Sequence, residues 1–212
     1  MKFSQSKIIK SSSIIKDYKK VENIIEERLR EFKRIWEEKN HIKIFKEFIF
    51  CLLTPQSKAK LCWESVLNLE KKNLLFKGDY NNIFNELNKV RFRKSKSMYI
   101  VENRMKFFKY NSFELINILE KIKDAEKARD YLFKNVKGYG FKEASHFLRN
   151  IGFSFELAIL DRHILKNLKN ENVIDEIPSN LSKIKYLEIE EKFKEFSNKT
   201  GIPLQNLDLF FW

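Results

Sequence analysis

The sequence contains few residues that interrupt helices, with only five glycines and three prolines in 212 residues. Cysteine is scarce as well, since Cys51 and Cys62 are the only two. Two cysteines are too few for a disulfide scaffold or a four-cysteine metal cluster, so we expect both thiols to be core residues in a reducing cytoplasm. The sequence has no His, Asp and Glu cluster with the spacing of metal ligands, so we expect no catalytic metal.

Long apolar runs are also absent. No stretch approaches about 18 consecutive apolar residues, so we expect no membrane-spanning helix and no membrane partner. The N-terminal stretch MKFSQSKIIKSSSIIKDYKK lacks the apolar core and small-residue cleavage site of a secretory signal. We therefore expect a cytoplasmic protein.

Positive charge is abundant. The chain has 42 Lys and Arg residues against 29 Asp and Glu residues, which gives a net charge of +13. Such an excess indicates a polyanionic partner, and nucleic acid is the simplest one. The alternative is the composition of a lysine-rich proteome, which the abundance of Ile and Asn also fits.

Helical periods dominate the chain. In VENIIEERLREFKRIWEE the apolar residues recur at the 3.6-residue spacing of an amphipathic helix. The stretches HIKIFKEFIFCLL and SKAKLCWESVLNL predict two more helices, and Ser57 is a plausible N-cap for the second. We find no alternating run long enough for a strand and no internal repeat. The expected fold class is therefore all-α, with about ten helices.

One helix pair differs from the rest. DAEKARDYLFKNV, the turn KGYG and FKEASHFLRNI read as a helix-hairpin-helix. Gly138 and Gly140 can adopt positive φ or let the backbone approach another surface closely. The unpaired amides at the start of the second helix favour an anion, and a DNA phosphate would fit. Alternatively, the glycines serve only the geometry of a tight turn.

Two charged residues near this hairpin are candidates for chemistry. Lys142 lies in the first turn of the second helix, at the edge of a face formed by Ala144, Phe147 and other apolar residues. The helix dipole and partial burial both disfavour its ammonium form, as a nucleophilic amine requires. Asp161 follows the apolar stretch LAIL and precedes the helix RHILKNL, where it is either an N-cap or an electrostatic group.

These stretches resemble a known family. KGYGFKEASHFLRNIG, followed by AILDRHIL, IDEIP, KYLEIE and LDLFFW, is similar to the archaeal-type 8-oxoguanine DNA glycosylase/AP lyases, the second Ogg family of the helix-hairpin-helix glycosylase superfamily. The resemblance covers most of the chain after about residue 20. It implies a single glycosylase unit over 1–212 with two helical lobes and a DNA-binding cleft between them. The central lobe would span about 42–145, and the second lobe would combine about 1–41 with 146–212.

The resemblance also implies a reaction. A lysine at the position of Lys142 attacks the sugar C1′ of the damaged nucleotide, the base leaves, and a Schiff base forms. β-Elimination then cuts the strand 3′ to the lesion. An aspartate at the position of Asp161, on the opposite side of the cleft, supports the displacement, since a fixed carboxylate stabilises positive charge on the sugar. The implied partner is double-stranded DNA containing 8-oxoguanine, bound by a nucleoid-associated monomer.

Further site residues are implied with the reaction. The damaged base must leave the stack, so a wedge and a pocket are needed. Gln56 would fill the vacated space, or is only part of a helix break. Phe92 would stack on bases while Arg91, Arg93, Lys94 and Lys96 hold phosphates, or the run is a basic surface with one core Phe. His163 would contact a phosphate or pack in its helix, and the indole of Trp212 would stack on the flipped base.

The sequence departs from the family pattern at two points. Superfamily members with an iron–sulfur cluster carry four cysteines near the C-terminus, whereas both cysteines here lie far upstream, so no cluster and no other cofactor is implied. Only a monovalent cation at the carbonyls of Val136 and Tyr139 is conceivable. Family members also continue into a short lysine-ended tail that reads 8-oxoguanine. This sequence ends at Trp212, and we expect it to cleave abasic sites but to select 8-oxoguanine less well than a tailed form.

Two other functions remain open at this point. A non-catalytic helix-hairpin-helix DNA-binding module would explain the charge and the glycines but leaves Lys142 and Asp161 without a role. A monofunctional glycosylase for another damaged base would use Asp161 to activate water. Covalent trapping by borohydride distinguishes the three, because only a lysine nucleophile forms a reducible imine with the sugar.

Overall fold

The computed structural model describes the backbone of residues 2–212 and the side chains from Ser13 onward. The chain divides into two compact units, one made of Met1–Lys33 with Ser154–Trp212 and the other of Arg34–Phe153. The described residues form twelve helices and one antiparallel pair of two-residue strands, β1 (Phe108–Lys109) and β2 (Ser112–Phe113). The expected all-α fold class is therefore confirmed.

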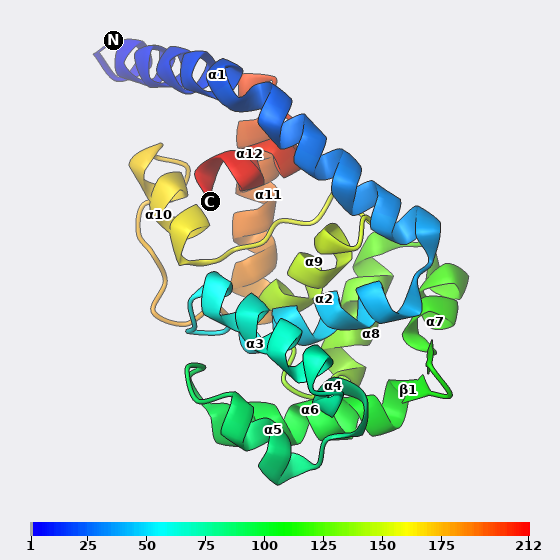
Figure 1. Cartoon of the computed structure of the whole chain (residues 1–212). Helices are drawn as coiled ribbons and strands as arrows, with labels where there is room; N and C mark the ends of the chain where they lie inside the picture. The colour runs from blue at the N-terminus through cyan, green and yellow to red at the C-terminus, as the bar shows by residue number, and fades with distance from the viewer. Residues whose placement is uncertain (1) are drawn as a thin grey trace. The chain divides into compact units, whose positions relative to one another are not determined.

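The second unit, Arg34–Phe153, holds most of the helices. It contains the end of α1, both strands and eight further helices: α2 (His41–Leu53), α3 (Ala59–Lys71), α4 (Leu74–Lys77), α5 (Tyr80–Glu86), α6 (Arg93–Phe107), α7 (Leu115–Ile122), α8 (Ala125–Asn135) and α9 (Phe141–Asn150). Within this unit α8 and α9 lie side by side as the two arms of the predicted hairpin (Figure 1).

Helix α2 is the centre of this unit. Asn40 caps it by accepting hydrogen bonds from the amides of Ile42 and Lys43. Apolar residues lie on nearly every side of the helix, as expected for a buried one, and it packs against α3, α6, α9 and β2. The rings of Phe45 and Phe48 anchor an aromatic cluster whose other members are Phe76, Phe107, Phe108, Phe113, Tyr139 and Phe147.

The first unit combines residues from both ends of the chain. Its helices are the first part of α1 (Lys2–Glu38), α10 (Arg162–Asn170), α11 (Lys183–Thr200) and α12 (Leu204–Phe211). The buried amide of Asn206 in α12 donates to the hydroxyl of Tyr18, at 2.9 Å, and to the carboxylate of Glu26, at 2.7 Å. Polar contacts between α1 and α12 thus join segments that are far apart in the sequence.

Two predictions about individual residues have clear outcomes. Cys51 and Cys62 are both fully buried, as expected. The prediction that Ser57 caps α3 is wrong, because Lys58 occupies the N-cap position and makes no side-chain cap. The Ser57 hydroxyl instead accepts a hydrogen bond from the amide of Arg91 at 3.1 Å.

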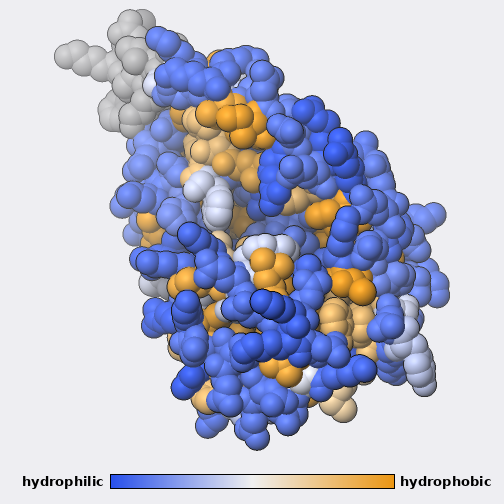
Figure 2. Space-filling model, in the orientation of Figure 1, coloured by the Kyte–Doolittle hydropathy of each residue, from blue (hydrophilic) through white to orange (hydrophobic). Residues whose placement is uncertain are grey.

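The visible face of the molecule is mainly hydrophilic, and its apolar side chains form separate small groups (Figure 2). Among the residues that the structure describes, no helix combines the length and the apolar character needed to cross a bilayer.

Candidate active site

The turn between α8 and α9 depends on one glycine more than on the other. Gly138 has a φ of 88°, a conformation that residues with a Cβ rarely adopt, and the ring of Tyr99 lies directly against it. Gly140 has an extended backbone, with φ −96° and ψ −175°, that any residue can adopt. The sequence suggested the same role for both glycines, whereas the structure assigns the left-handed conformation to Gly138 alone.

Side chains from α6 and from the turn itself fix this hairpin. The buried side chain of Asn103 exchanges two hydrogen bonds with the backbone of Lys137, donating to its carbonyl at 2.8 Å and accepting from its amide at 3.0 Å. The hydroxyl of Tyr139 donates to the carbonyl of Phe48 at 2.8 Å, and burial raises the pKa of this phenol well above its ordinary value. The turn is therefore held from both sides.

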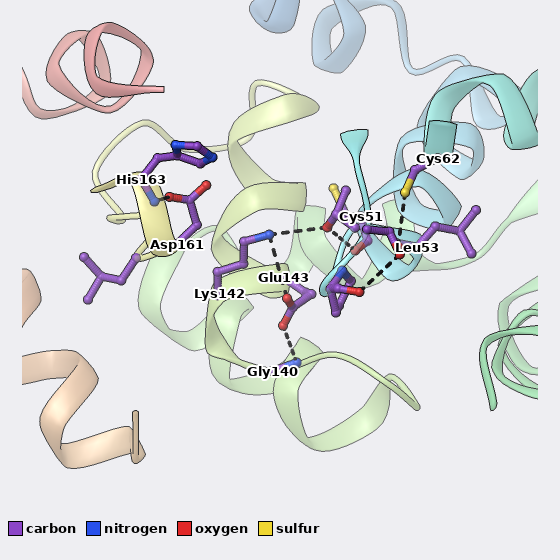
Figure 3. A network of polar contacts seen from close by, with 12 residues as sticks. Cys51, Leu53, Cys62, Gly140, Lys142, Glu143, Asp161 and His163 are labelled. Atoms are coloured by element: carbon purple, nitrogen blue, oxygen red, sulfur yellow. Dashed lines mark hydrogen bonds and ion pairs between the residues drawn. The ribbon is translucent and has the colours of Figure 1, made fainter. Parts of the chain in front are cut away.

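The start of α9 has its own carboxylate. Glu143 reaches back so that its Oε2 accepts a hydrogen bond from the amide of Gly140 at 3.1 Å (Figure 3). This is a capping-box contact, and the pattern of a helix start followed three residues later by Glu could have predicted it. Because Glu143 already occupies this amide, the expected phosphate contact does not include the Gly140 N–H in the conformation observed.

Lys142 points away from its own helix toward the C-terminal end of α2 (Figure 3). Its Nζ donates a hydrogen bond to the hydroxyl oxygen of Thr54 at 3.3 Å and lies 3.8 Å from Oε1 of Glu143. The Thr54 hydroxyl in turn donates to the carbonyl of Cys51 at 2.9 Å. With 21% of its side chain exposed, Lys142 is oriented by two partners and still reachable from solvent.

Burial makes the thiol of Cys51 and the imidazole of His146, two groups near Lys142, unreactive. Burial, reinforced by Glu47, raises the pKa of the Cys51 thiol well above its ordinary value, so it is no thiolate nucleophile. His146 lies one turn after Lys142 with its ring edge-on to Phe50. Burial first, then the charges of Lys142 and Arg149, hold the pKa of His146 well below its ordinary value. Neither group competes with the partly exposed amine of Lys142 as a nucleophile on this surface of α9.

Asp161 belongs to the first unit and is the N-cap of α10, as its residue type predicted. Its Oδ1 accepts hydrogen bonds from the amides of His163, at 2.8 Å, and Ile164, at 2.9 Å (Figure 3). The carboxylate is partly exposed, and the imidazole of His163 is exposed. The cap fixes the direction of the Asp161 side chain and leaves its second oxygen, Oδ2, for another partner.

The expected DNA-contacting residues of the second unit lie on two turns. Gln56 is exposed in the turn after α2 and has a φ of 53°, an uncommon conformation for a residue other than glycine. Phe92 precedes α6 with a φ of 58°, and the residue is 54% exposed. The guanidinium of Arg91 lies over the Phe92 ring at 5.3 Å, and that of Arg93 lies over the Phe84 ring at 4.1 Å.

The burial of Lys96 contradicts one part of the sequence interpretation. The sequence predicts that the cations of the RFRKSK run bind phosphates, but only 4% of Lys96 is exposed, so Lys96 cannot meet a phosphate on the surface. Helical phase explains the difference, because Lys96 shares the inner face of α6 with Ile100, Asn103 and Phe107. Lys96 and Asn103 are polar residues on an otherwise apolar face of the helix, and this pattern in the sequence could have indicated that both are buried and hydrogen-bonded.

Trp212 follows α12 in the first unit. Trp212 is 67% exposed, whereas Leu207 in α12 is fully buried. The ring of Phe211 stacks on those of Phe193 and Phe196 in α11, with centroids 6.1 and 6.4 Å apart. This packing holds α12 and leaves the indole available.

No group of three or more His, Cys, Asp and Glu residues in the described part of the chain is placed to hold a metal ion. At the hairpin the carbonyl of Val136 accepts a hydrogen bond from the amide of Tyr139 at 3.3 Å. A monovalent cation at this turn would have to share that carbonyl.

Known proteins resemble this chain in sequence and in fold. The family model described as 8-oxoguanine DNA glycosylase, with the helix-hairpin-helix, matches residues 25–202. The 8-oxoguanine DNA glycosylase/AP lyase of Fusobacterium nucleatum is 43% identical over 201 residues, which are 95% of this chain and 93% of that protein.

Solved structures agree with the sequence comparison. The crystal structure of the Methanocaldococcus jannaschii 8-oxoguanine glycosylase/lyase in complex with a 15mer DNA containing 8-oxoguanine has a TM-score of 0.82 at 34% identity, covering 94% of this chain and 95% of that one. The Thermotoga maritima 8-oxoguanine DNA glycosylase has a TM-score of 0.83 at 31% identity, covering 97% and 95%. With the hairpin, the lysine after it and the capping aspartate all in place, this chain belongs to the 8-oxoguanine DNA glycosylase family with a helix-hairpin-helix.

Proposed function

We propose that this protein excises 8-oxoguanine from double-stranded DNA and cleaves the strand at the resulting abasic site, with Lys142 as the nucleophile. The proposal rests on the position, the hydrogen bonding and the exposure of the Lys142 amine. It lies at the first turn of the helix after the hairpin, it is bonded to Thr54, and it is still partly exposed. A nucleophile needs both orientation and access to its substrate.

The chemistry follows from an amine at this place. Nζ, once it has lost a proton, donates its lone pair to C1′, and the bond from C1′ to N9 of the base breaks. The base leaves with that electron pair and takes up a proton. Opening of the sugar ring gives an imine between Lys142 and C1′. Removal of a proton from C2′ then expels the 3′ phosphate. The carboxylate of Glu143, 3.8 Å from Nζ, is suited to accept the first proton.

Asp161 supports the same displacement in this mechanism. Breaking the N-glycosidic bond develops positive charge on the sugar, and a carboxylate of fixed direction stabilises that charge. The two amide hydrogen bonds to Oδ1 supply the fixed direction. Since Lys142 and Asp161 act on one sugar, loss of either must slow base excision.

The hairpin and the two exposed turns of the second unit are the proposed DNA contacts. A cavity of about 440 Å³ opens beside the hairpin, and its lining includes Lys106, Lys134 and Lys137. These cations and the turn at Gly138 suit a phosphate. Arg91 and Arg93 add charge beside Phe92, and His163 and Trp212 of the first unit are proposed to meet a phosphate and the flipped base.

Borohydride trapping on a duplex with one 8-oxoguanine tests the assignment. Lys142→Gln should lose trapping and strand cleavage while the Kd for the duplex changes by less than about threefold, because it removes the nucleophile and one charge. Lys121→Gln, which removes an exposed charge at the end of α7, is the matched control and should trap normally. Undiminished trapping by Lys142→Gln would refute the proposal. Base excision by the unmodified protein without any trapping would favour a monofunctional glycosylase instead.

A further inference from the structure

We propose that Lys96 is a positioning residue for the Lys142 reaction: its buried ammonium holds the turn from Leu53 to Ser57 in the conformation that presents the Thr54 hydroxyl to Lys142 and Gln56 to the surface. The inference rests on the proposed function of Lys142 and extends it to a group that does not touch the substrate.

The ammonium of Lys96 uses all of its donors on this turn. Nζ donates to the carbonyl of Leu53 at 2.7 Å, to the carbonyl of Pro55 at 2.8 Å and to the hydroxyl of Ser57 at 3.1 Å. An ammonium has three N–H groups, so the match is complete. The turn therefore wraps around a single cation supplied by α6.

The turn also has hydrogen bonds that do not involve Lys96. Leu53 ends α2, where helical carbonyls lack partners in their own helix, and Pro55 has no amide hydrogen to donate. The amide of Ser57 donates to the carbonyl of Thr54 at 3.0 Å, and the thiol of Cys62 donates to the carbonyl of Leu53 at 3.2 Å (Figure 3). The Ser57 hydroxyl also bonds the Pro55 carbonyl and the Arg91 amide, and the Thr54 hydroxyl bonds the Cys51 carbonyl and the Lys142 amine. Lys96 adds a single group that ties the Leu53 end of this path to its Ser57 end.

Both residues that the turn presents depend on that path. The Thr54 hydroxyl is the hydrogen-bond acceptor of the Lys142 amine. Gln56 keeps a φ of 53°, which persists in a non-glycine residue only when its surroundings impose it. If the turn relaxes, Thr54 and Gln56 move together, since a single residue separates them.

A buried ammonium is a costly way to fill this space. Burial lowers the pKa of Lys96 to about 8, with Cys62 of α3 and Glu143 of α9 opposing the shift and Lys142 of α9 and Arg91 adding to it. An apolar side chain such as methionine would fill a similar volume without that desolvation. What methionine lacks is the three directed hydrogen bonds, so the charge is linked to the conformation of the turn rather than to packing.

The test compares the buried Lys96 with Arg104, a half-buried cation of the same helix. Lys96→Met removes the cation that holds the Thr54 turn. Arg104→Met removes one that bonds the carbonyls of Leu74, Leu75 and Gly78 instead, and so leaves the Thr54 turn intact. The readout is the single-turnover rate of β-elimination on a preformed abasic duplex at saturating protein, with thermal unfolding measured alongside. We expect Lys96→Met to be slower by about tenfold to a hundredfold, as for a misplaced catalytic group, and Arg104→Met to react within twofold of the unmodified protein.

A pH series separates positioning from stability. In the unmodified protein Lys96 loses its charge and one donor as pH rises past about 8, so the rate advantage over Lys96→Met should be largest below pH 8 and shrink above it. A merely structural lysine predicts a ratio that does not change with pH. A folded Lys96→Met that reacts at the unmodified rate, an equal loss in Arg104→Met, or a flat ratio would each overturn the inference.

Two further results keep the inference separate from the proposed function. If the unmodified protein neither traps nor cleaves, the proposed function fails and the inference falls with it. If Lys142→Gln abolishes trapping but Lys96→Met is silent, only the inference fails. Should Lys96→Met not fold, Thr54→Val replaces it: the unmodified rate should decline above pH 8 relative to Thr54→Val, and a constant ratio would overturn the inference.

Discussion

Replacing Gly138 by alanine tests whether the hairpin is as tightly built as the structure indicates. A Cβ added to Gly138 would lie 2.5 Å from Cδ2 and 3.0 Å from Cε2 of the Tyr99 ring, closer than non-bonded carbons approach. The residue would also have to keep a φ of 88°. Either the ring or the turn must therefore move.

The expected loss of stability has two parts. A left-handed conformation costs a residue with a Cβ about 1–2 kcal/mol, and forced overpacking adds about 1–3 kcal/mol. We therefore expect Gly138→Ala to lower the free energy of unfolding by about 2–5 kcal/mol. Gly201→Ala is the matched control, because Gly201 has a φ of 70° with nothing within 4 Å of an added Cβ. It should lose only the first part, about 1–2 kcal/mol.

Urea unfolding followed by circular dichroism measures both losses, and a duplex with an abasic-site analogue measures binding. Gly138→Ala should also weaken binding, because the turn shifts, whereas Gly201→Ala should not. A double-mutant cycle with Tyr99→Ala isolates the ring contact. The argument is wrong if Gly138→Ala costs no more than Gly201→Ala, or if the coupling energy with Tyr99 is close to zero.

The remaining predictions concern Asp161, His146 and the positive charge. Asp161→Asn should keep the cap, so its free energy of unfolding should lie within about 0.5 kcal/mol of that of the unmodified protein, whereas Asp161→Ala should lower it by about 1 kcal/mol. Both variants should slow base excision by orders of magnitude. If Asp161→Asn excises the base at the unmodified rate, Asp161 serves only as a helix cap. Because the pKa of His146 is held well below its ordinary value, the unfolded chain alone takes up its proton below about pH 6.5, and stability should fall by up to about 1.4 kcal/mol per pH unit. His146→Phe should flatten this decline in urea titrations between pH 7 and 5, and an unchanged slope would contradict the assignment. Affinity for duplex DNA should drop steeply with salt, and Arg93→Gln should reduce the log–log slope by about one while Lys121→Gln leaves it unchanged; equal slopes in all three would argue against Arg93 as a phosphate contact.

The sequence predicted those parts of the site that depend only on residues close together in the chain. A helix start after G-Y-G and a carboxylate before RHIL are local patterns, and the structure contains both the hairpin and the Asp161 cap. Glu143 was not singled out, although a Glu three residues after the helix N-cap is an equally local pattern. Local patterns sufficed here because a cap bonds only to residues within the next turn.

Contacts between distant segments were not visible in the same way. Lys96 meets carbonyls 41 and 43 positions away, and although its helical phase indicates an inward position, no local pattern indicates these partners. Lys96 and the amide of Arg91 also donate to the Ser57 hydroxyl, while Lys58 stands at the N-cap of α3. The strands β1 and β2 have two residues each, too few for an alternating pattern to show.

The division of the chain has a consequence for its synthesis. The second unit is one continuous stretch, Arg34–Phe153, so every segment it needs has been made before α10 begins. The first unit cannot close until α12 exists, since Tyr18 and Asn206 are 188 positions apart. A nascent chain paused before α11 would carry a complete second unit while Tyr18 of α1 still lacks its partners. An unfinished first unit of this kind exposes apolar surface, which favours aggregation and chaperone capture.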